Sequence, residues 1–91
     1  MEITYDPHKD LLNTNKHGVS LSLSESLEWD WLQSMPDTRY DYGEKRMIGY
    51  APIGDHVYCV VYVDRFQQRR IISLRKATKR EVLRYVRNIN P

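Results

Sequence analysis

The sequence RRIISLRKATKRE at residues 69–81 decides the fold. Its first half predicts a strand, because the two isoleucines and Leu74 are the branched and bulky residues that strands favour. Its second half predicts the start of a helix. Thr78 is a helix-capping residue, and Glu81 stands three positions later, which is the spacing of a capping box. We therefore expect a buried strand that runs directly into a C-terminal helix.

The corner between this strand and this helix carries more positive charge than the fold needs. Its cations are Arg69, Arg70, Arg75, Lys76, Lys79 and Arg80. Residues 1–64 contain 5 Lys and Arg against 11 Asp and Glu, a net charge of −6, whereas residues 65–91 contain 9 against 1, a net charge of +8. Such a split predicts an anionic partner, most often nucleic acid. The alternative is a solvated helix whose cations are favoured by the helix dipole.

The length and composition predict one domain, residues 1–91. No apolar run approaches the roughly 20 residues of a membrane span, and the N-terminus lacks the layout of a signal peptide. The single cysteine, Cys59, cannot form an internal disulfide, which agrees with a reducing compartment. We expect a cytoplasmic protein without membrane contact.

The N-terminal part predicts a short strand over residues 2–5 and then two helices. The first runs from about Pro7 to Lys16, with Asp6 as its cap, Gly18 as its stop and its two leucines turned inward. The second starts near Ser22 or Ser24, because apolar residues recur at helical spacing on one side. Those residues are Leu23, Leu27, Trp31 and Leu32.

The C-terminal part predicts an antiparallel sheet. Residues 33–43 are expected to form a loop, residues 45–51 and 56–64 two strands joined by a turn at 52–55, and the opening stretch a third. The fold class is therefore α+β: N-terminal helices, a three- to four-stranded antiparallel sheet and a C-terminal helix. We expect the valine row of residues 57–63 to pack against the helices, leaving the other face, with Tyr58 and Tyr62, partly open.

No metal or cofactor site is indicated. His56 and Cys59 lie on opposite faces of a strand, and the other histidines have no partner at ligand spacing. The chain has no glycine-rich phosphate loop and no nucleophile elbow. Because Cys59 stands in a valine-rich row, we interpret it as a buried structural thiol.

The remaining cations and aromatic residues favour RNA. Arginine binds phosphate, and aromatic rings stack on unpaired bases. RNA cleavage without a metal needs a group that takes the 2′-OH proton, a group that protonates the leaving 5′-oxygen, and cations for the phosphorane. Arg46, Arg70 and Arg75 suit the last task, and His17 is a candidate for proton transfer.

Each candidate also has a structural explanation. His17 ends a helix, where an imidazolium is favoured. Arg46 and Arg70 can pair across strands with Glu44 or with the carboxylate at position 64. The tyrosines of the middle strand can be packing residues. Glu81 can be only the capping carboxylate, or a general base beside the cations.

Four motifs, in this order, resemble the BrnT toxins of bacterial type II toxin–antitoxin systems. They cover the chain from about residue 6 to 85 and run Asp6-Pro7-x-Lys9, Asn13-x-x-Lys16-His17-Gly18-Val19-Ser20, Glu44-x-Arg46 and Arg70-Ile71-Ile72-Ser73-x-Arg75-Lys76-Ala77-Thr78-x-x-Glu81. The sequence departs from the family pattern at Leu21, at Leu74, and at the two tryptophans of the second helix. These departures look like packing changes that leave the cations intact.

The resemblance implies a RelE-like fold and a metal-independent endoribonuclease that arrests growth by cutting cellular RNA. It also implies a BrnA-like antitoxin with a ribbon-helix-helix DNA-binding domain, held in a hetero-oligomer. The matching catalytic candidates are Lys16, His17, Arg46, Arg70 and Arg75. The RNA-binding candidates are Tyr58, Tyr62, Lys76, Lys79 and Arg80. The rival hypotheses are a non-catalytic nucleic-acid-binding or regulatory module on the same scaffold, and an interaction protein whose tail docks an acidic partner.

Overall fold

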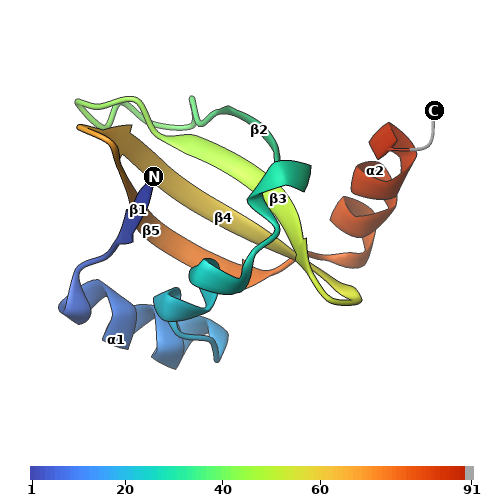
Figure 1. Ribbon diagram of the computed structural model, residues 1–91, viewed down its shortest axis with the longest axis horizontal. Coiled ribbons are helices and arrows are strands. Elements are labelled where there is room, and N and C mark those ends of the chain that lie inside the picture. The colour runs from blue at the N-terminus through green and yellow to red at the C-terminus, as the bar shows by residue number, and fades with distance from the viewer. Residues whose placement is uncertain (90–91) are drawn as a thin grey trace.

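A computed structural model describes residues 1–89 and shows a mixed sheet with a helix at either end of the chain (Figure 1). The α+β class is thus confirmed. In none of the described residues is there a helix long and apolar enough to cross a bilayer. In chain order the elements are β1 (Glu2–Thr4), α1 (Pro7–His17), the 3-10 segments η1 (Leu21–Ser26) and η2 (Trp29–Trp31), β2 (Gln33–Pro36), β3 (Met47–Ile53), β4 (His56–Arg65), β5 (Gln68–Lys76) and α2 (Lys79–Ile89).

The sheet has five strands in the order β1-β5-β4-β3-β2. The meander of β3, β4 and β5 is antiparallel as predicted, but the expectation of three to four antiparallel strands was wrong in two respects. β1 joins the edge of β5 in parallel. β2 forms within the predicted loop and pairs with β3 from Gln33 to Pro36. Its proline concealed it, since proline is tolerated only at sheet edges and strand ends.

The predicted second α-helix is absent, and η1 and η2 take its place. The serines explain the difference, because their hydroxyls compete for backbone groups that a helix would use. The Ser24 hydroxyl donates to the Leu21 carbonyl at 2.6 Å, and the Trp29 indole N–H donates to the Ser24 carbonyl at 3.0 Å. Leu27 is already in extended conformation. Tight turns that carry leucines to the sheet replace a regular helix.

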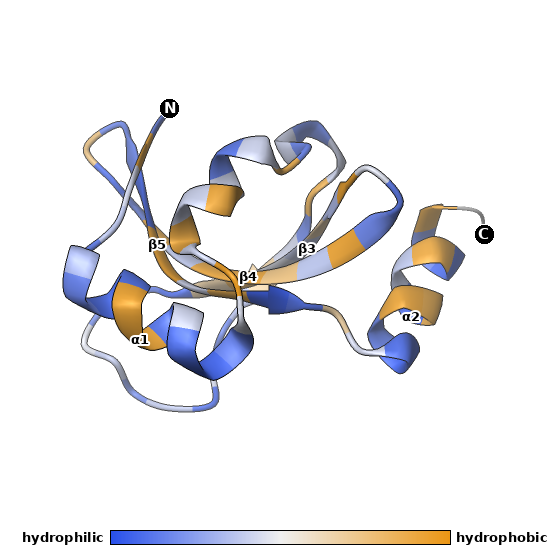
Figure 2. Cartoon of the chain, turned by 90° about the horizontal axis from the view of Figure 1, so that it is seen from below, coloured by the Kyte–Doolittle hydropathy of each residue, from blue (hydrophilic) through white to orange (hydrophobic). Residues whose placement is uncertain are grey.

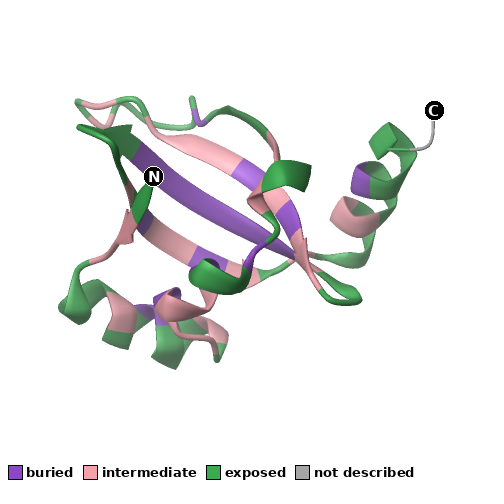
Figure 3. Ribbon diagram, viewed as in Figure 1, coloured by how far each residue is buried: buried purple, intermediate pink, exposed green. Residues whose placement is uncertain are grey.

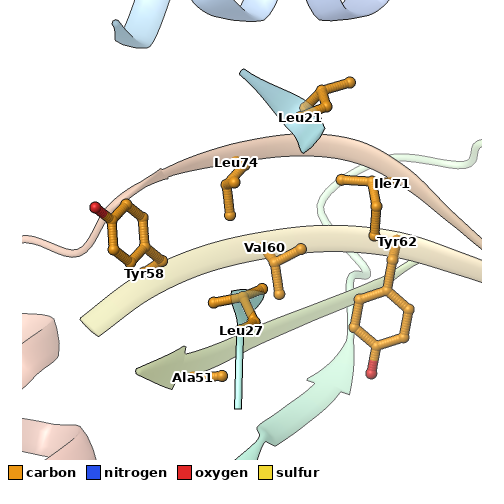
Figure 4. Close-up of a cluster of buried hydrophobic side chains, with 8 residues drawn as sticks. All are labelled: Leu21, Leu27, Ala51, Tyr58, Val60, Tyr62, Ile71 and Leu74. Atoms are coloured by element: carbon orange, nitrogen blue, oxygen red, sulfur yellow. The ribbon is translucent and has the colours of Figure 1, made fainter. Parts of the chain in front are cut away.

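The core lies on the face of the sheet that η1 and η2 cover, and β4 is buried along most of its length (Figure 3). Figure 4 shows its side chains: Leu21, Leu27, Ala51, Tyr58, Val60, Tyr62, Ile71 and Leu74. The tyrosine row, expected on the open face, therefore faces the core. Both rows of β4 are apolar enough to be buried, so periodicity alone does not choose between them. Leu21 and Leu74 are fully buried.

Helix α1 begins at the Asp6 cap and ends at Gly18 in left-handed conformation, as predicted. Its leucines do not turn inward: Leu11 and Leu12 are 61% and 55% exposed, so that expectation was wrong. Asn13 is the buried residue of this helix. The helix is therefore held mainly by a polar contact and not by an apolar stripe.

Asn13 binds the edge of β5 at Leu74. This position lies beyond Arg70, the last residue of β5 that pairs with β1. Its amide nitrogen donates to the Leu74 carbonyl at 2.9 Å, and its amide oxygen accepts from the Leu74 N–H at 3.1 Å. The same nitrogen donates to the Val19 carbonyl at 2.9 Å. Because buried backbone groups need partners, one side chain here substitutes for a neighbouring strand.

Helix α2 stands beside one end of the sheet, away from α1 (Figures 1 and 2). Both halves of the predicted capping box are confirmed: the Thr78 N–H donates to Glu81 at 2.8 Å, and the Glu81 N–H donates to the Thr78 hydroxyl at 3.2 Å. The Tyr85 hydroxyl donates to the Trp31 carbonyl at 2.6 Å. Leu83 and Val86 stay exposed, so α2 is docked by few contacts.

We predict that Asn13→Ala lowers the free energy of unfolding by about 2–4 kcal/mol, because it leaves a buried donor and a buried acceptor of Leu74 without partners. Urea unfolding followed by circular dichroism measures the change. The matched control is Asn15→Ala, an exposed asparagine on the same helix that should change stability little. Equal effects of the two substitutions would contradict the role assigned to Asn13.

Candidate active site

The face of the sheet opposite the core carries two of the predicted catalytic cations, Arg70 and Arg75. Residues that pair directly across strands share a face, and neighbours along a strand alternate between faces. The registers place one set on this face, which we call the arginine face: Tyr50, Cys59, Val61, Val63, Arg70, Ser73 and Arg75.

The floor of the arginine face is apolar. Cys59, Val61 and Val63 are each buried. Burial raises the pKa of the Cys59 thiol, so it is protonated and unreactive at neutral pH. The interpretation of Cys59 as a buried thiol is confirmed. The chemistry of this face must therefore come from the longer side chains around the floor.

Arg75 is fixed by Glu81. Two parallel hydrogen bonds of 2.8 and 3.0 Å join the guanidinium to the carboxylate, and the Tyr50 hydroxyl donates to the same carboxylate at 2.9 Å. The bond from Arg75 lowers the pKa of Glu81 to about 2. Glu81 is thus the capping carboxylate, as one alternative held, and also the clamp on Arg75. A carboxylate of such low pKa is a poor general base at neutral pH.

Arg70 and Arg46 share a second carboxylate, that of Glu44. Arg70 donates to it at 3.2 Å, so of the two carboxylates considered for Arg70 it pairs with Glu44, which precedes β3. Nε of Arg46 lies 3.7 Å from the same carboxylate, beyond hydrogen-bond distance, and is buried without a hydrogen-bond partner. The Arg46 guanidinium stacks on the Tyr42 ring at 4.1 Å. Arg46 therefore has an unused donor.

His17 lines a hollow of about 220 Å³ between α1 and β5. The other lining residues are Lys9, Leu12, Asn13, Lys16, Ile72 and Ser73. Burial lowers the pKa of His17 from its ordinary value of 6.5, and the charges of Lys16 and Arg75 lower it further. These cations oppose the helix dipole, so the neutral imidazole, which can accept a proton, predominates at neutral pH.

Arg69 has a structural role on the core face. Its guanidinium lies 4.6 Å from the centre of the Trp29 ring and 4.5 Å from that of Tyr62, and pairs with Asp64 at 2.8 Å. Asp64 is therefore the partner of Arg69 and not of Arg70. This cation of the opening stretch does not reach the arginine face.

Several RNA-binding candidates do not reach the arginine face either. Tyr58 and Tyr62 are 7% and 2% exposed, and the prediction that they stack on bases was wrong because both rings are in the core. Lys76 is exposed but shares the side of Tyr58 by register. Lys79 lies on the side of α2 away from Glu81, given 3.6 residues per turn. Arg80 is exposed in the first turn of α2, and its role stays a prediction.

Sequence reasoning missed Tyr50 and Asn13 as contributors to the site. Tyr50 pairs with Cys59 in the register, so an alignment of β3 with β4 could have placed it beside Arg75. Asn13 opens the second motif, but its role could not be predicted because its partner Leu74 is distant in the sequence. Within residues 1–89, no group of three or more His, Cys, Asp or Glu side chains gathers with the geometry of a metal site.

Comparison with known families decides the class of protein. Residues 5–81 match the family described as the ribonuclease toxin BrnT of type II toxin–antitoxin systems. The chain belongs to the BrnT family. No curated protein matches it. The BrnT match ends at Glu81, so most of α2 lies outside it.

Membership of the BrnT family gives the two distinctive motifs a common location. The motif with Asn13, Lys16 and His17 lines the hollow from α1. The motif that runs from Arg70 to Glu81 contributes Ile72 and Ser73 to the wall of the hollow from β5. The family is described as a ribonuclease toxin of type II toxin–antitoxin systems. We take the arginine face and the hollow beside it, which carry Arg70, Arg75 and His17, as the candidate active site.

We predict that Glu81→Gln makes stability less sensitive to acid. Because the folded pKa of Glu81 is about 2 against an ordinary 4.5, its ionised form stabilises the fold above about pH 4.5, and this contribution is lost as the pH falls toward 2. Glutamine keeps the capping box but loses the charge. We expect the free energy of unfolding to fall by about 2 kcal/mol at pH 7 and to depend less steeply on pH in acid.

Thermal unfolding at several pH values between 2 and 7 measures this effect. Glu25→Gln removes an exposed carboxylate from η1 and serves as the control. Part of the acid slope should survive in Glu81→Gln, because Arg39 also holds the pKa of Asp37 well below its usual range. If the stability of Glu81→Gln depends on pH as steeply as that of the parent protein, the ion pair between Glu81 and Arg75 does not stabilise the fold.

Proposed function

We propose that this chain is a metal-independent endoribonuclease toxin that cuts cellular RNA and arrests growth, and that the arginine face is its active site. The observation that carries the proposal is that His17, whose pKa is lowered by burial and by the charges of Lys16 and Arg75, lines a hollow with Ser73 of the arginine face. Arg70 and Arg46 extend the same positive surface through Glu44.

The proposed reaction is transfer of the RNA phosphate to the neighbouring 2′-oxygen. His17 takes the 2′-OH proton as that oxygen bonds to phosphorus, and the bond from phosphorus to the 5′-oxygen breaks. Lys16, which lines the same hollow, returns a proton to the leaving 5′-oxygen. The products are a 2′,3′-cyclic phosphate and a 5′-hydroxyl, and no metal takes part. Arg75 stabilises the charge that develops on the phosphorane.

The carboxylate partners of the arginines support such a role. Glu81 holds the Arg75 guanidinium in one orientation, which lowers the cost of arranging it around a phosphate. The Arg75 side chain is 33% exposed and that of Arg70 49%, so both can reach RNA while still paired. The unused Nε donor of Arg46 adds a group that a phosphate oxygen could satisfy.

We further propose a BrnA-like antitoxin with a ribbon-helix-helix domain, a single functional domain over residues 1–91 and a RelE-like fold. Exposed apolar residues on α2, Leu83 and Val86, alternate with cations and suit an acidic amphipathic segment of that antitoxin. The reading frame next to this gene tests the partner: a frame that encodes no ribbon-helix-helix protein would contradict it.

The alternative is a non-catalytic nucleic-acid-binding or regulatory module on the same scaffold. One observation favours it: Arg70 and Arg75 are each already paired with a carboxylate. Such pairs could serve binding alone. Cleavage in the absence of divalent metals separates the two functions.

We predict that the purified protein cleaves RNA in EDTA and that His17→Ala and Arg75→Lys each lower the rate roughly 100-fold or more. Lysine keeps the charge at position 75 but loses the planar fork. Arg87→Ala removes an exposed cation from α2 and should leave the rate unchanged. Gel analysis of a defined single-stranded RNA supplies the rates.

The pH dependence of the cleavage rate tests whether His17 acts as the general base. A general base must be neutral, and the folded environment lowers the pKa of His17 below 6.5. The cleavage rate should therefore hold from neutral pH to below 6.5 and fall only in more acidic solution. If the folded protein leaves RNA intact, and if Arg75→Lys still arrests growth in cells, the ribonuclease proposal is wrong and the non-catalytic alternative holds.

A further inference from the structure

A bulky aromatic residue occupies an unfavourable position at the tip of the β4–β5 hairpin. Phe66 and Gln67 have φ angles of 53° and 65°, the left-handed conformation that both central residues of a type I′ turn require. Such turns favour Asn-Gly, and a bulky side chain there is an outlier. Phe66 is also 87% exposed. Neither the backbone conformation nor the exposed ring of Phe66 stabilises the fold. We therefore look for a function of this side chain.

The ring of Phe66 borders a small hollow at one end of the arginine face. The hollow has a volume of about 80 Å³ and is lined by Thr4, Val63, Arg65, Phe66, Gln68 and Arg70. At roughly 30 Å³ per water it holds two or three waters. The Arg65 guanidinium lies 5.9 Å from the ring centre. Arg70 is the same residue that pairs with Glu44, so the hollow adjoins the candidate active site.

We propose that Phe66 is a stacking platform for one unpaired base of the RNA, and that Arg65 and Arg70 hold the phosphate next to that base. The inference rests on the proposed function, in which the arginine face binds RNA. Exposed aromatic rings beside cations are the usual device for binding single strands, because every base has a π-face and every nucleotide a phosphate. The amide of Gln68 adds a donor and an acceptor for a base edge.

The surroundings favour RNA over a protein partner. An aromatic anchor at a protein interface is ringed by further contacts that exclude water. Around this hollow the other apolar residue is Val63, which is buried, and the remaining lining residues are polar or charged. A lone ring among hydrogen-bond donors fits a nucleobase.

The position of Phe66 separates binding from chemistry. Arg70 and Arg75 are five residues apart on β5, about 16 Å at 3.3 Å per residue. A base on Phe66 therefore belongs to a nucleotide well separated along the RNA strand from the one that reacts near Arg75. Substitution of Phe66 should raise KM and Kd but leave kcat nearly unchanged, which makes Phe66 a binding residue and not a catalytic one.

The test compares Phe66→Asn with Phe66→Trp. Asparagine tolerates the left-handed conformation, so the variant should unfold at the same temperature or a higher one, yet bind RNA about 5-fold more weakly or worse. Tryptophan keeps a stacking face and should bind within 2-fold of the parent. Leu11→Gln removes an exposed apolar side chain from α1 that lines neither hollow, and should leave the RNA affinity unchanged.

Fluorescence anisotropy with a 2′-O-methylated single-stranded oligoribonucleotide gives the affinity, because the methyl group blocks cleavage. A set of oligonucleotides with one abasic position each then locates the stacked base. One abasic position should weaken binding to the parent protein by the same factor as Phe66→Asn and have no additional effect on that variant. Additive effects at every position would overturn the inference.

The outcomes also separate this inference from the proposed function. If the parent protein binds and cleaves RNA while Phe66→Asn does so equally well, only the stacking role falls. If Phe66→Asn loses antitoxin binding but keeps its RNA affinity, the ring is a protein contact and the inference is again overturned. If the parent neither binds nor cleaves RNA, the proposed function fails and the stacking role fails with it.

Discussion

The hydrogen bonds from Asn13 to Leu74 hold the candidate site together. β1 pairs with β5 only as far as Arg70, so the rest of that edge needs another partner. Asn13 supplies it, and in doing so fixes α1, which has few apolar contacts of its own, against the sheet. His17 lies one helical turn further along α1. A single buried amide therefore brings the proposed base to the hollow beside Ser73 of β5.

The division of the sheet into two faces follows from where the leucines of η1 go. They cover the tyrosine row of β4, which leaves the cysteine and valine row as the floor of the arginine face. The cations around that floor are kept in place by carboxylates, as Glu81 does for Arg75 and Glu44 for Arg70. These carboxylates offset the repulsion between neighbouring cations and fix the direction of each guanidinium. A surface of this kind recognises phosphate by position as well as by charge.

Local features of the fold could be predicted from the sequence, and features set by distant contacts could not. The caps at Asp6 and Thr78 depend on neighbours within a few residues, and both are correct. The choice of core face on β4, the strand β2 and the 3-10 turns depend on packing between segments far apart in the chain. For the site, the motifs supplied the arginines and His17. Tyr50 emerged only from the strand register, and burial removed Tyr58 from the RNA-binding set.

The most direct test of the central claim is to map RNA on the protein by NMR, with a 2′-O-methylated oligoribonucleotide that binds without being cut. If the arginine face is the active site, the amide shifts should concentrate at His17, Arg70, Ser73 and Arg75. Residues on the opposite face, such as those of η1, should stay unchanged. Shifts confined to α2 or to the core face, with none at Arg70 or Arg75, would contradict the account.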